Sequence, residues 1–254
     1  SRQLSEAAND GEEFQYRPSR NPNAKIRVGY LSADFHDHAT AHLMRGVFQA
    51  HDRESFSIHA YSHGPNDDSD YRDSIRASCD QFVDISAFND EEAANLIHRD
   101  SIDILVDLKG HTRHNRLGIC ARRPASIQAT YLGFPGTSGA EFFDYILTDK
   151  IVTPPETLEC LGEKAVFLPN TYQCNDNTQE KLTDINNNYL YIRNKHSFIF
   201  CSFNNPIKID FGFFQIWMSL LKSVPNSALW ILQNNLRAKE NLSHAATRAG
   251  VAPG

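Results

Sequence analysis

Histidine and carboxylate side chains gather between residues 34 and 42, in the run DFHDHATAH. The run follows a strand-like segment and opens a segment with helical spacing. An imidazole titrates near neutral pH, so His38 could act as a general base, and a helix N-terminus here would favour an anionic ligand. Two other interpretations stay open. One is a surface loop in which Asp37 or Thr40 caps the helix. The other is a zinc site, although its histidine spacing of i, i+2 and i+6 is not typical of helical ligands.

Two further polar clusters each follow a predicted strand. Residues 109–115 (KGHTRHN) come directly after an apolar run, and residues 133–139 (GFPGTSG) follow the next one. Glycines at every third position of the second cluster allow backbone N–H groups to approach a ligand closely. An ordinary surface loop and a tight Pro-Gly turn are the alternative interpretations of these clusters.

A fourth cluster, residues 203–210 (FNNPIKID), lies between a predicted strand and a predicted helix. Lys208 stands near the start of that helix, where the helix dipole disfavours a cation. A bound anion such as a diphosphate would explain the lysine. A solvent-exposed lysine without a ligand explains it equally well.

Alternating strands and helices must position these clusters. Strands separated by helices of about 10–15 residues indicate βαβ units and a parallel sheet covered on both faces. The nearly continuous apolar run IDILVDL predicts a strand buried on both sides. Ligands of open parallel sheets bind beyond the C-terminal ends of the strands, where the four clusters lie. The predicted strands are 26–32, 56–61, 81–85, 102–108, 127–132, 145–147, 165–168, 197–203 and 228–233, and the predicted helices are 41–51, 68–79, 91–99, 210–222 and 235–250.

The distribution of polar residues divides the chain into four segments. Residues 1–25, with mixed charge and two prolines, are interpreted as a linker from an upstream region. Residues 26–170 form the first α/β domain. Residues 171–194 are mostly polar without a clear period and are interpreted as a connector. Residues 195–254 begin a second α/β domain, which we expect to be truncated after about two βα repeats.

Composition and charge narrow the class of protein. The 254 residues include 25 Lys and Arg against 31 Asp and Glu, and the net charge of −6 argues against a protein that coats nucleic acid. No apolar run approaches the roughly 18 residues of a membrane-spanning helix, and we expect no signal peptide. Five widely spaced cysteines without a C-x-x-C pair suit free thiols in a reducing compartment. We therefore expect a cytoplasmic protein with neither nucleic acid nor membrane as a partner.

Taken together, the clusters resemble the catalytic region of glycosyltransferase family 41, which contains the protein O-GlcNAc transferases and the SPINDLY-type transferases. The resemblance is carried by residues 26–43 (IRVGYLSADFHDHATAHL), 107–149, 163–176 and 200–210 (FCSFNNPIKID), and residues 123–139 are its most specific part. It implies an α/β fold of two Rossmann-like lobes of the GT-B type, with the active site between them. The N-terminal lobe would be complete and the C-terminal lobe truncated.

The resemblance also implies roles for individual residues. Asp34 and His38 match active-site residues of the family's D-F-x-x-H-x-T motif, and Lys208 matches the lysine that neutralises the diphosphate leaving group. His111 stands where animal enzymes have Tyr, and Asn205 replaces a Gln, which keeps the amide but shortens its reach. The residues implied to bind donor or acceptor are Thr40, His111, Thr112, Leu132, Gly133, Pro135 and Asn205.

The resemblance leads us to expect an inverting glycosyltransferase that needs no metal and no cofactor. It would move N-acetylglucosamine from UDP-GlcNAc to Ser or Thr hydroxyls of proteins, and an upstream tetratricopeptide region would bind the protein acceptors. The hydroxyl proton would pass to Asp34, to His38 or to the donor's own α-phosphate. A transferase that uses GDP-fucose and a non-catalytic scaffold lobe are the alternatives. Because the family's remaining nucleotide contacts lie further downstream, we expect this chain alone to be inactive or nearly so.

Overall fold

The computed structural model describes residue 14, residues 24–179 and residues 187–253. The chain divides into two compact units, residues 1–179 (unit 1) and residues 180–254 (unit 2), and each is described by itself. The linker expected at residues 1–25 lies outside the described residues, apart from residues 14, 24 and 25.

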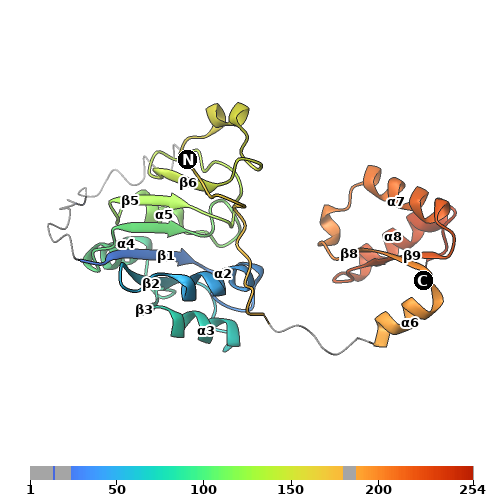
Figure 1. Cartoon of the computed structure of the whole chain (residues 1–254), viewed down its shortest axis with the longest axis horizontal. Coiled ribbons are helices and arrows are strands. Elements are labelled where there is room, and N and C mark those ends of the chain that lie inside the picture. Colours follow the sequence, from blue (N-terminus) through green and yellow to red (C-terminus); the bar gives the residue numbers. More distant parts are fainter. Residues whose placement is uncertain (1–13, 15–23, 180–186, 254) are drawn as a thin grey trace. The chain divides into compact units, whose positions relative to one another are not determined.

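Unit 1 is built on a seven-stranded sheet in which each strand pairs in parallel with its neighbours (Figure 1). The strand order is β3-β2-β1-β4-β5-β6-β7, so the chain runs outward from β1 in one direction and then outward from β4 in the other. This arrangement confirms the predicted parallel α/β fold. The strands are β1 (Ile26–Ser32), β2 (Phe56–Ser62), β3 (Gln81–Asp84), β4 (Ile104–Asp107), β5 (Ile127–Thr130), β6 (Tyr145–Thr148) and β7 (Lys164–Phe167).

Polar side chains mark where the longer helices of unit 1 begin. His38, Ser69 and Asn89 each accept a hydrogen bond from a backbone N–H of the following first turn. In the third case Glu92 completes a capping box. The helix α5 has five residues and no side-chain cap, so its sequence carries no such signal. The helices are α2 (Ala39–Ala50), α3 (Asp70–Ser78), α4 (Asp90–Arg99), α5 (Leu117–Ala121) and the 3-10 helix η1 (Pro155–Cys160).

The alternation of side chains along β1 and β4 divides the core of unit 1 into two clusters. Leu31 and Leu105 belong to a cluster with residues of α4 and α5. Tyr30 and Val106 belong to a cluster with residues of α2 and α3. Successive residues of a strand face opposite sides, so strands that are apolar at nearly every position require cover on both faces. The helices therefore flank the sheet on two sides, as the apolar runs predict.

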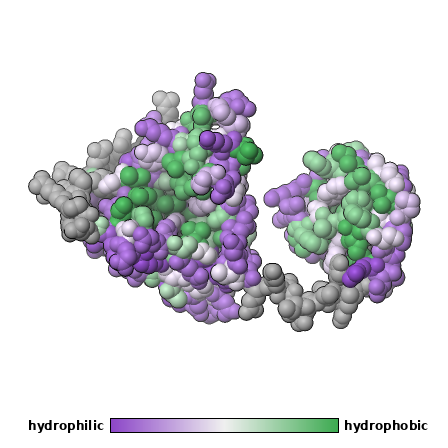
Figure 2. Space-filling view, viewed as in Figure 1, coloured by the Kyte–Doolittle hydropathy of each residue, from purple (hydrophilic) through white to green (hydrophobic). Residues whose placement is uncertain are grey.

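Unit 2 contains the parallel strands β8 (Phe198–Ser202) and β9 (Ser227–Ile231). Asp210 caps α7, because its Oδ1 accepts hydrogen bonds from the first turn. Several large apolar side chains of α7 stay exposed, and Figure 2 shows apolar surface gathered on the visible face of this unit. The other elements of unit 2 are α6 (Asn187–Lys195), η2 (Pro206–Lys208), α7 (Phe211–Ser223) and α8 (Leu236–Arg248).

The stretch interpreted as a connector, residues 171–194, contains more structure than its polar sequence suggests. Residues 171–179 belong to unit 1, where the Asp176 carboxylate accepts a hydrogen bond of 2.8 Å from Arg45 Nε. Residues 187–195 form α6, which the sequence does not predict because its apolar residues lack a helical period. Residues 180–186 lie outside the described residues.

Candidate functional site

A cavity of about 950 Å³ lies at the C-terminal ends of β1 and β4, between which the strand order reverses. The helices that follow these two strands cover opposite faces of the sheet, so the two loops diverge and leave a crevice between them. Asp34, His38, Lys109, Thr112 and Gly133 all contribute to its lining. Three of the four polar clusters predicted from the sequence therefore meet in one cavity.

The carboxylate of Asp34 is buried in the polar network of this cavity. Lys109 Nζ donates to both of its oxygens, at 2.9 and 2.7 Å, and Thr40 Oγ1 donates to Oδ2 at 3.2 Å. Asp34 is 6% exposed and Lys109 is 4% exposed, so the two charges compensate each other away from water. This ion pair joins the loop after β1 to the loop after β4.

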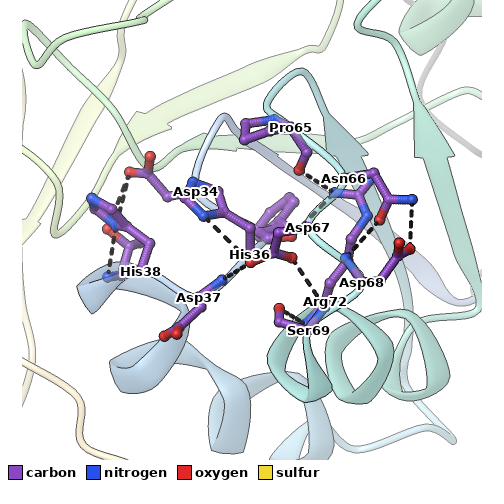
Figure 3. Close-up of polar contacts among 12 residues, drawn as sticks. Asp34, His36, Asp37, His38, Pro65, Asn66, Asp67, Asp68, Ser69 and Arg72 are labelled. Carbon is purple, nitrogen blue, oxygen red and sulfur yellow. Dashed lines mark hydrogen bonds and ion pairs between the residues drawn. The ribbon is translucent and has the colours of Figure 1, made fainter.

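The His38 ring lines the cavity at the start of α2 (Figure 3). Its Nδ1 accepts the Thr40 backbone N–H at 3.2 Å and lies 3.5 Å from Asp34 Oδ2. Burial lowers the pKa of His38 below its usual value. The Asp34 charge raises that pKa, and the Lys109 charge lowers it again. Because Nδ1 acts as an acceptor, the proton of the neutral ring resides on Nε2.

Buried polar contacts fix the opposite wall of the cavity. Arg72 of α3 is 1% exposed, and its guanidinium donates to the Phe35 carbonyl at 3.1 Å and to Asp84 Oδ2 at 2.9 Å. Asp67, in the loop after β2, accepts the Asp37 backbone N–H at 2.7 Å (Figure 3). The loops that follow β1 and β2 and the end of β3 are thus tied together beside the cavity.

The loop after β5 approaches the loop after β4 closely at Gly133. Thr112 and Gly133 both line the cavity, and Thr112 Oγ1 donates to the Lys109 carbonyl at 2.8 Å. A Cβ added at Gly133 would lie 2.0 Å from the Leu108 carbonyl oxygen. Only glycine fits at this position, because the obstructing atoms belong to the backbone of the neighbouring loop.

We expect Gly133→Ala to lower the free energy of unfolding by about 1–3 kcal/mol, since the two loops must separate to admit the methyl group. Gly136→Ala is the matched control, because a Cβ there would meet a movable Phe134 ring at 3.2 Å. Urea denaturation of both variants measures the difference. An equal loss in both would contradict the close approach as its cause.

Three of the predicted residues of unit 1 do not line the cavity. His111 Nε2 donates to the Ser138 carbonyl at 2.8 Å, and its ring packs edge-to-face on Phe134 with centroids 5.4 Å apart. Leu132, at φ 66°, is half-buried and packs against the core cluster that contains residues of α2 and α3. Pro135 is exposed. His111 therefore holds the loop after β5 in place.

Lys208 and Asn205 belong to unit 2, within the loop that connects β8 to α7. Asn205 Oδ1 accepts the Ile207 backbone N–H at 3.2 Å and so caps η2. Lys208 is exposed at the end of η2, and within residues 24–179 and 187–253 no carboxylate forms an ion pair with it. Its ammonium group is therefore available to an anion.

The structure does not support the zinc interpretation of the first cluster. In the described part of the chain, no group of three or more His, Cys, Asp or Glu side chains could hold a metal ion. His42 Nε2 instead lies 2.6 Å from Asp37 Oδ1.

Of the helices that the structure describes, none has the length and apolar content needed to cross a membrane.

Comparison with known proteins identifies the family. The sequence model of "Glycosyl transferase family 41" matches residues 8–191 and 180–254. The chain belongs to glycosyltransferase family 41. This family assignment confirms the resemblance seen in the sequence.

Two curated plant proteins illustrate the similarity of this family 41 chain to its relatives. It is 37% identical over 234 residues to the probable UDP-N-acetylglucosamine–peptide N-acetylglucosaminyltransferase SEC of Arabidopsis thaliana, covering 90% of this chain and 24% of the relative. It is 32% identical over 218 residues to the SPINDLY protein of the same plant, which has the same enzyme description, covering 83% of this chain and 23% of the relative. The chain thus spans about a quarter of the length of these relatives.

A solved structure is similar over nearly the whole family 41 chain. It is an O-GlcNAc transferase of Thermobaculum terrenum in a lysine-to-methionine mutant form. The TM-score is 0.81 and the sequence identity 28%, with 98% of this chain and 48% of the other covered. This likeness confirms the predicted GT-B type of α/β fold.

Two buried cations of this family 41 site were not among the predicted site residues. Lys109 lies in the second polar cluster, but a lysine in a loop is ordinarily solvated, and its partner Asp34 is 75 positions away. Arg72 lies on a helix with a strongly charged sequence, which suggests an exposed face. A charged residue directly after a buried strand is the one local signal that could have marked Lys109.

Burial of His63 in the cavity wall gives a testable pH dependence. Burial, followed by the charges of Arg116 and Lys109, lowers the pKa of His63 from 6.5 to about 4. The pKa of His63 is lower in the folded protein than in the unfolded one, so protonation of His63 favours the unfolded state. The free energy of unfolding is therefore highest above pH 6.5 and decreases as the pH falls towards 4. The loss amounts to about 3 kcal/mol.

We expect His63→Gln to lose less stability than the wild type between pH 7 and about pH 4. Urea denaturation at both pH values measures this difference, and circular dichroism follows the unfolding. Acid destabilisation of equal size in both proteins would contradict the role of His63.

Proposed function

We propose that this chain is part of a protein O-GlcNAc transferase that moves N-acetylglucosamine from UDP-GlcNAc to Ser or Thr hydroxyls of proteins, with inversion and without a metal. The observation that carries the proposal is the cavity at the β1–β4 reversal, where His38 and the Asp34–Lys109 pair meet in a family 41 fold. The enzyme descriptions of the plant relatives support the choice of donor and acceptor.

The proposed reaction exchanges one bond at the anomeric carbon of the sugar. The acceptor oxygen attacks from the face opposite the diphosphate, and the bond from carbon to the diphosphate oxygen breaks. Negative charge therefore develops on the leaving UDP. The exposed ammonium of Lys208 is suited to stabilise this charge. Electrostatic stabilisation of developing charge is the largest single contribution to catalysis in many enzymes.

The contacts of the cavity narrow the choice of proton acceptor. Asp34 is poorly placed to accept the hydroxyl proton, because Lys109 binds both of its oxygens. His38 carries its proton on Nε2, so its free ring edge is a hydrogen-bond donor towards bound substrate. We therefore assign the hydroxyl proton to an α-phosphate oxygen of the donor, and we assign to His38 the orientation of the substrate.

The proposal includes a cellular setting and partners. All five cysteines are free thiols, which favours the reducing cytoplasm as the compartment. Protein acceptors would be presented by an upstream tetratricopeptide region, and neither nucleic acid nor membrane is proposed as a partner. Thr40, Thr112 and Gly133 would contact the donor or the acceptor through the cavity.

A donor screen with the complete natural protein tests this function. A Ser-containing acceptor peptide is incubated with UDP-GlcNAc or with GDP-fucose, with and without EDTA, and mass spectrometry and NMR identify the product. We expect transfer from UDP-GlcNAc in the presence of EDTA, with the opposite anomeric configuration in the product. Transfer only from GDP-fucose would overturn the donor assignment. A protein that binds neither nucleotide sugar and transfers nothing would be a scaffold.

A further inference from the structure

Lys109 occupies a position that determines which hydrogen bonds remain for His38. We propose that Lys109 is a positioning residue that fixes His38 as a neutral imidazole with its proton on Nε2. The inference deepens the proposed function and rests on it only for the effect on transfer. The protonation of His38 can be measured whether or not the donor assignment is correct.

Two basic side chains lie beside the buried Asp34 carboxylate, which also accepts a hydrogen bond from Thr40 Oγ1 at 3.2 Å. Lys109 Nζ lies 2.9 and 2.7 Å from its two oxygens, whereas His38 Nδ1 lies 3.5 Å from the nearer one. The lysine contacts are hydrogen bonds and the histidine contact is too long to be one. Lys109 therefore satisfies the carboxylate, and His38 Nδ1 has no need to donate to it.

The backbone of α2 uses the nitrogen that this arrangement leaves free. Nδ1 of His38 accepts the Thr40 N–H at 3.2 Å, and this N–H belongs to the first turn of the helix, where no intrahelical acceptor exists. A proton on Nδ1 would remove the acceptor and leave the Thr40 N–H without this partner. The helix cap and the lysine thus favour the same tautomer.

The charges around His38 also favour the neutral ring. The titratable and charged groups that face it are Asp34 and His36 from the loop after β1, His42 from α2 and Lys109 from the loop after β4. Burial and three of these groups lower the pKa of His38, and only Asp34 raises it. Loss of Lys109 would leave Asp34 as an uncompensated buried charge, and His38 Nδ1 is the nitrogen poised to protonate and pair with it.

This control has a direct chemical consequence for the cavity. With its proton on Nε2, His38 offers an N–H to an oxygen of the bound substrate. If the proton moved to Nδ1, the same ring edge would become an acceptor, and if the ring gained a proton it would carry a charge beside the sugar. Lys109 thus determines which kind of group the substrate meets, although it need not touch the substrate itself.

Long-range ¹H–¹⁵N NMR of the complete natural protein labelled at histidine tests the inference. His38→Gln identifies the His38 signals, and their ¹⁵N shifts report the tautomer and, over a pH series, the pKa. We expect the Nε2–H form in the wild type. In Lys109→Met we expect a protonated Nδ1 and a pKa of His38 that is higher by about 1 or more. In a transfer assay at pH 7, Lys109→Met should lower kcat about tenfold or more, with the pH optimum displaced upwards.

Matched variants separate this role from simple loss of a charge. Lys150→Met removes an exposed lysine and should leave the His38 spectrum and the transfer rate unchanged. The double variant Asp34→Asn with Lys109→Met removes both buried charges and should restore the neutral Nε2–H form. If Lys109→Met does not fold, Lys109→Gln, which keeps a donor without a charge, provides the comparison.

Two results would overturn the inference: a wild-type His38 with its proton on Nδ1, or a tautomer and pKa that stay the same when the Lys109 charge is removed. These results stand apart from the proposed function. A wild-type protein that transfers no sugar but shows the expected change at His38 would refute the function and keep the inference.

Discussion

Arg72→Met is expected to lower the free energy of unfolding of the chain by about 3–5 kcal/mol, as removal of one member of a buried charged network does. The guanidinium is 1% exposed and donates to the Phe35 carbonyl, to Ser62 Oγ at 2.9 Å and to Asp84 Oδ2. Methionine fills much of the same volume but supplies no donor. Two buried acceptors would lose this donor, and the loop after β1 would lose its connection to the ends of β2 and β3.

Arg76→Met is the matched control for this prediction. Arg76 lies on the same helix and over the same Phe82 ring, but its side chain is 50% exposed, and its ion pair with Asp73 joins two exposed side chains. An exposed pair of this kind contributes about 0–1 kcal/mol. Urea denaturation followed by circular dichroism compares the variants. Tryptophan fluorescence serves as an internal reference, because Trp217 and Trp230 both belong to unit 2. Equal losses for Arg72→Met and Arg76→Met would contradict the structural explanation.

Lys208→Met is expected to reduce kcat for transfer from UDP-GlcNAc about 10²–10³-fold in the complete natural protein. The side chain is exposed, and in the described part of the chain no carboxylate competes for it. Its charge should act mainly on the leaving diphosphate, so the effect should be larger on kcat than on KM for the donor. The stability of the fold should change little, because the substitution removes no buried contact.

Lys239→Met provides the control, since Lys239 is an exposed lysine on another helix of unit 2. Steady-state kinetics of both variants, with circular dichroism to verify folding, measure the effect. If Lys208→Met retains wild-type kcat, the diphosphate has another partner and the role assigned to Lys208 is wrong.

The sequence predicts the elements of the fold better than the interior of the site. The strand predicted at residues 26–32 matches β1 at both ends, because a run of apolar and β-branched residues between polar segments is a local signal. The strand predicted at residues 102–108 is shorter in the structure, where β4 spans Ile104–Asp107. The sequence does not predict the helix α6, because its apolar residues form no amphipathic pattern.

The contacts of the site depend on residues that are far apart in the chain. The first polar cluster is recognisable from its position after a strand, but nothing near Asp34 in the sequence indicates that Lys109 would bind it. The direction in which a loop side chain turns is equally hidden. His111 has the residue type of a ligand-binding group, yet the fold directs its Nε2 to the Ser138 carbonyl. Such choices are made by tertiary packing, which local patterns do not encode.

The inner position of β1 in the sheet, between β2 and β4, has a consequence for how the protein is made. Ile26 of β1 pairs with Phe56 of β2, and Val28 of β1 pairs with Ile104 of β4. The strand β4 leaves the ribosome much later than β1 and β2. Contacts between distant parts of a chain form slowly, and domains fold as units during synthesis. We therefore expect the nascent chain to hold β1 and β2 with one edge uncovered until β4 emerges. The Asp34–Lys109 pair would then form only after β4 and the loop that follows it have emerged.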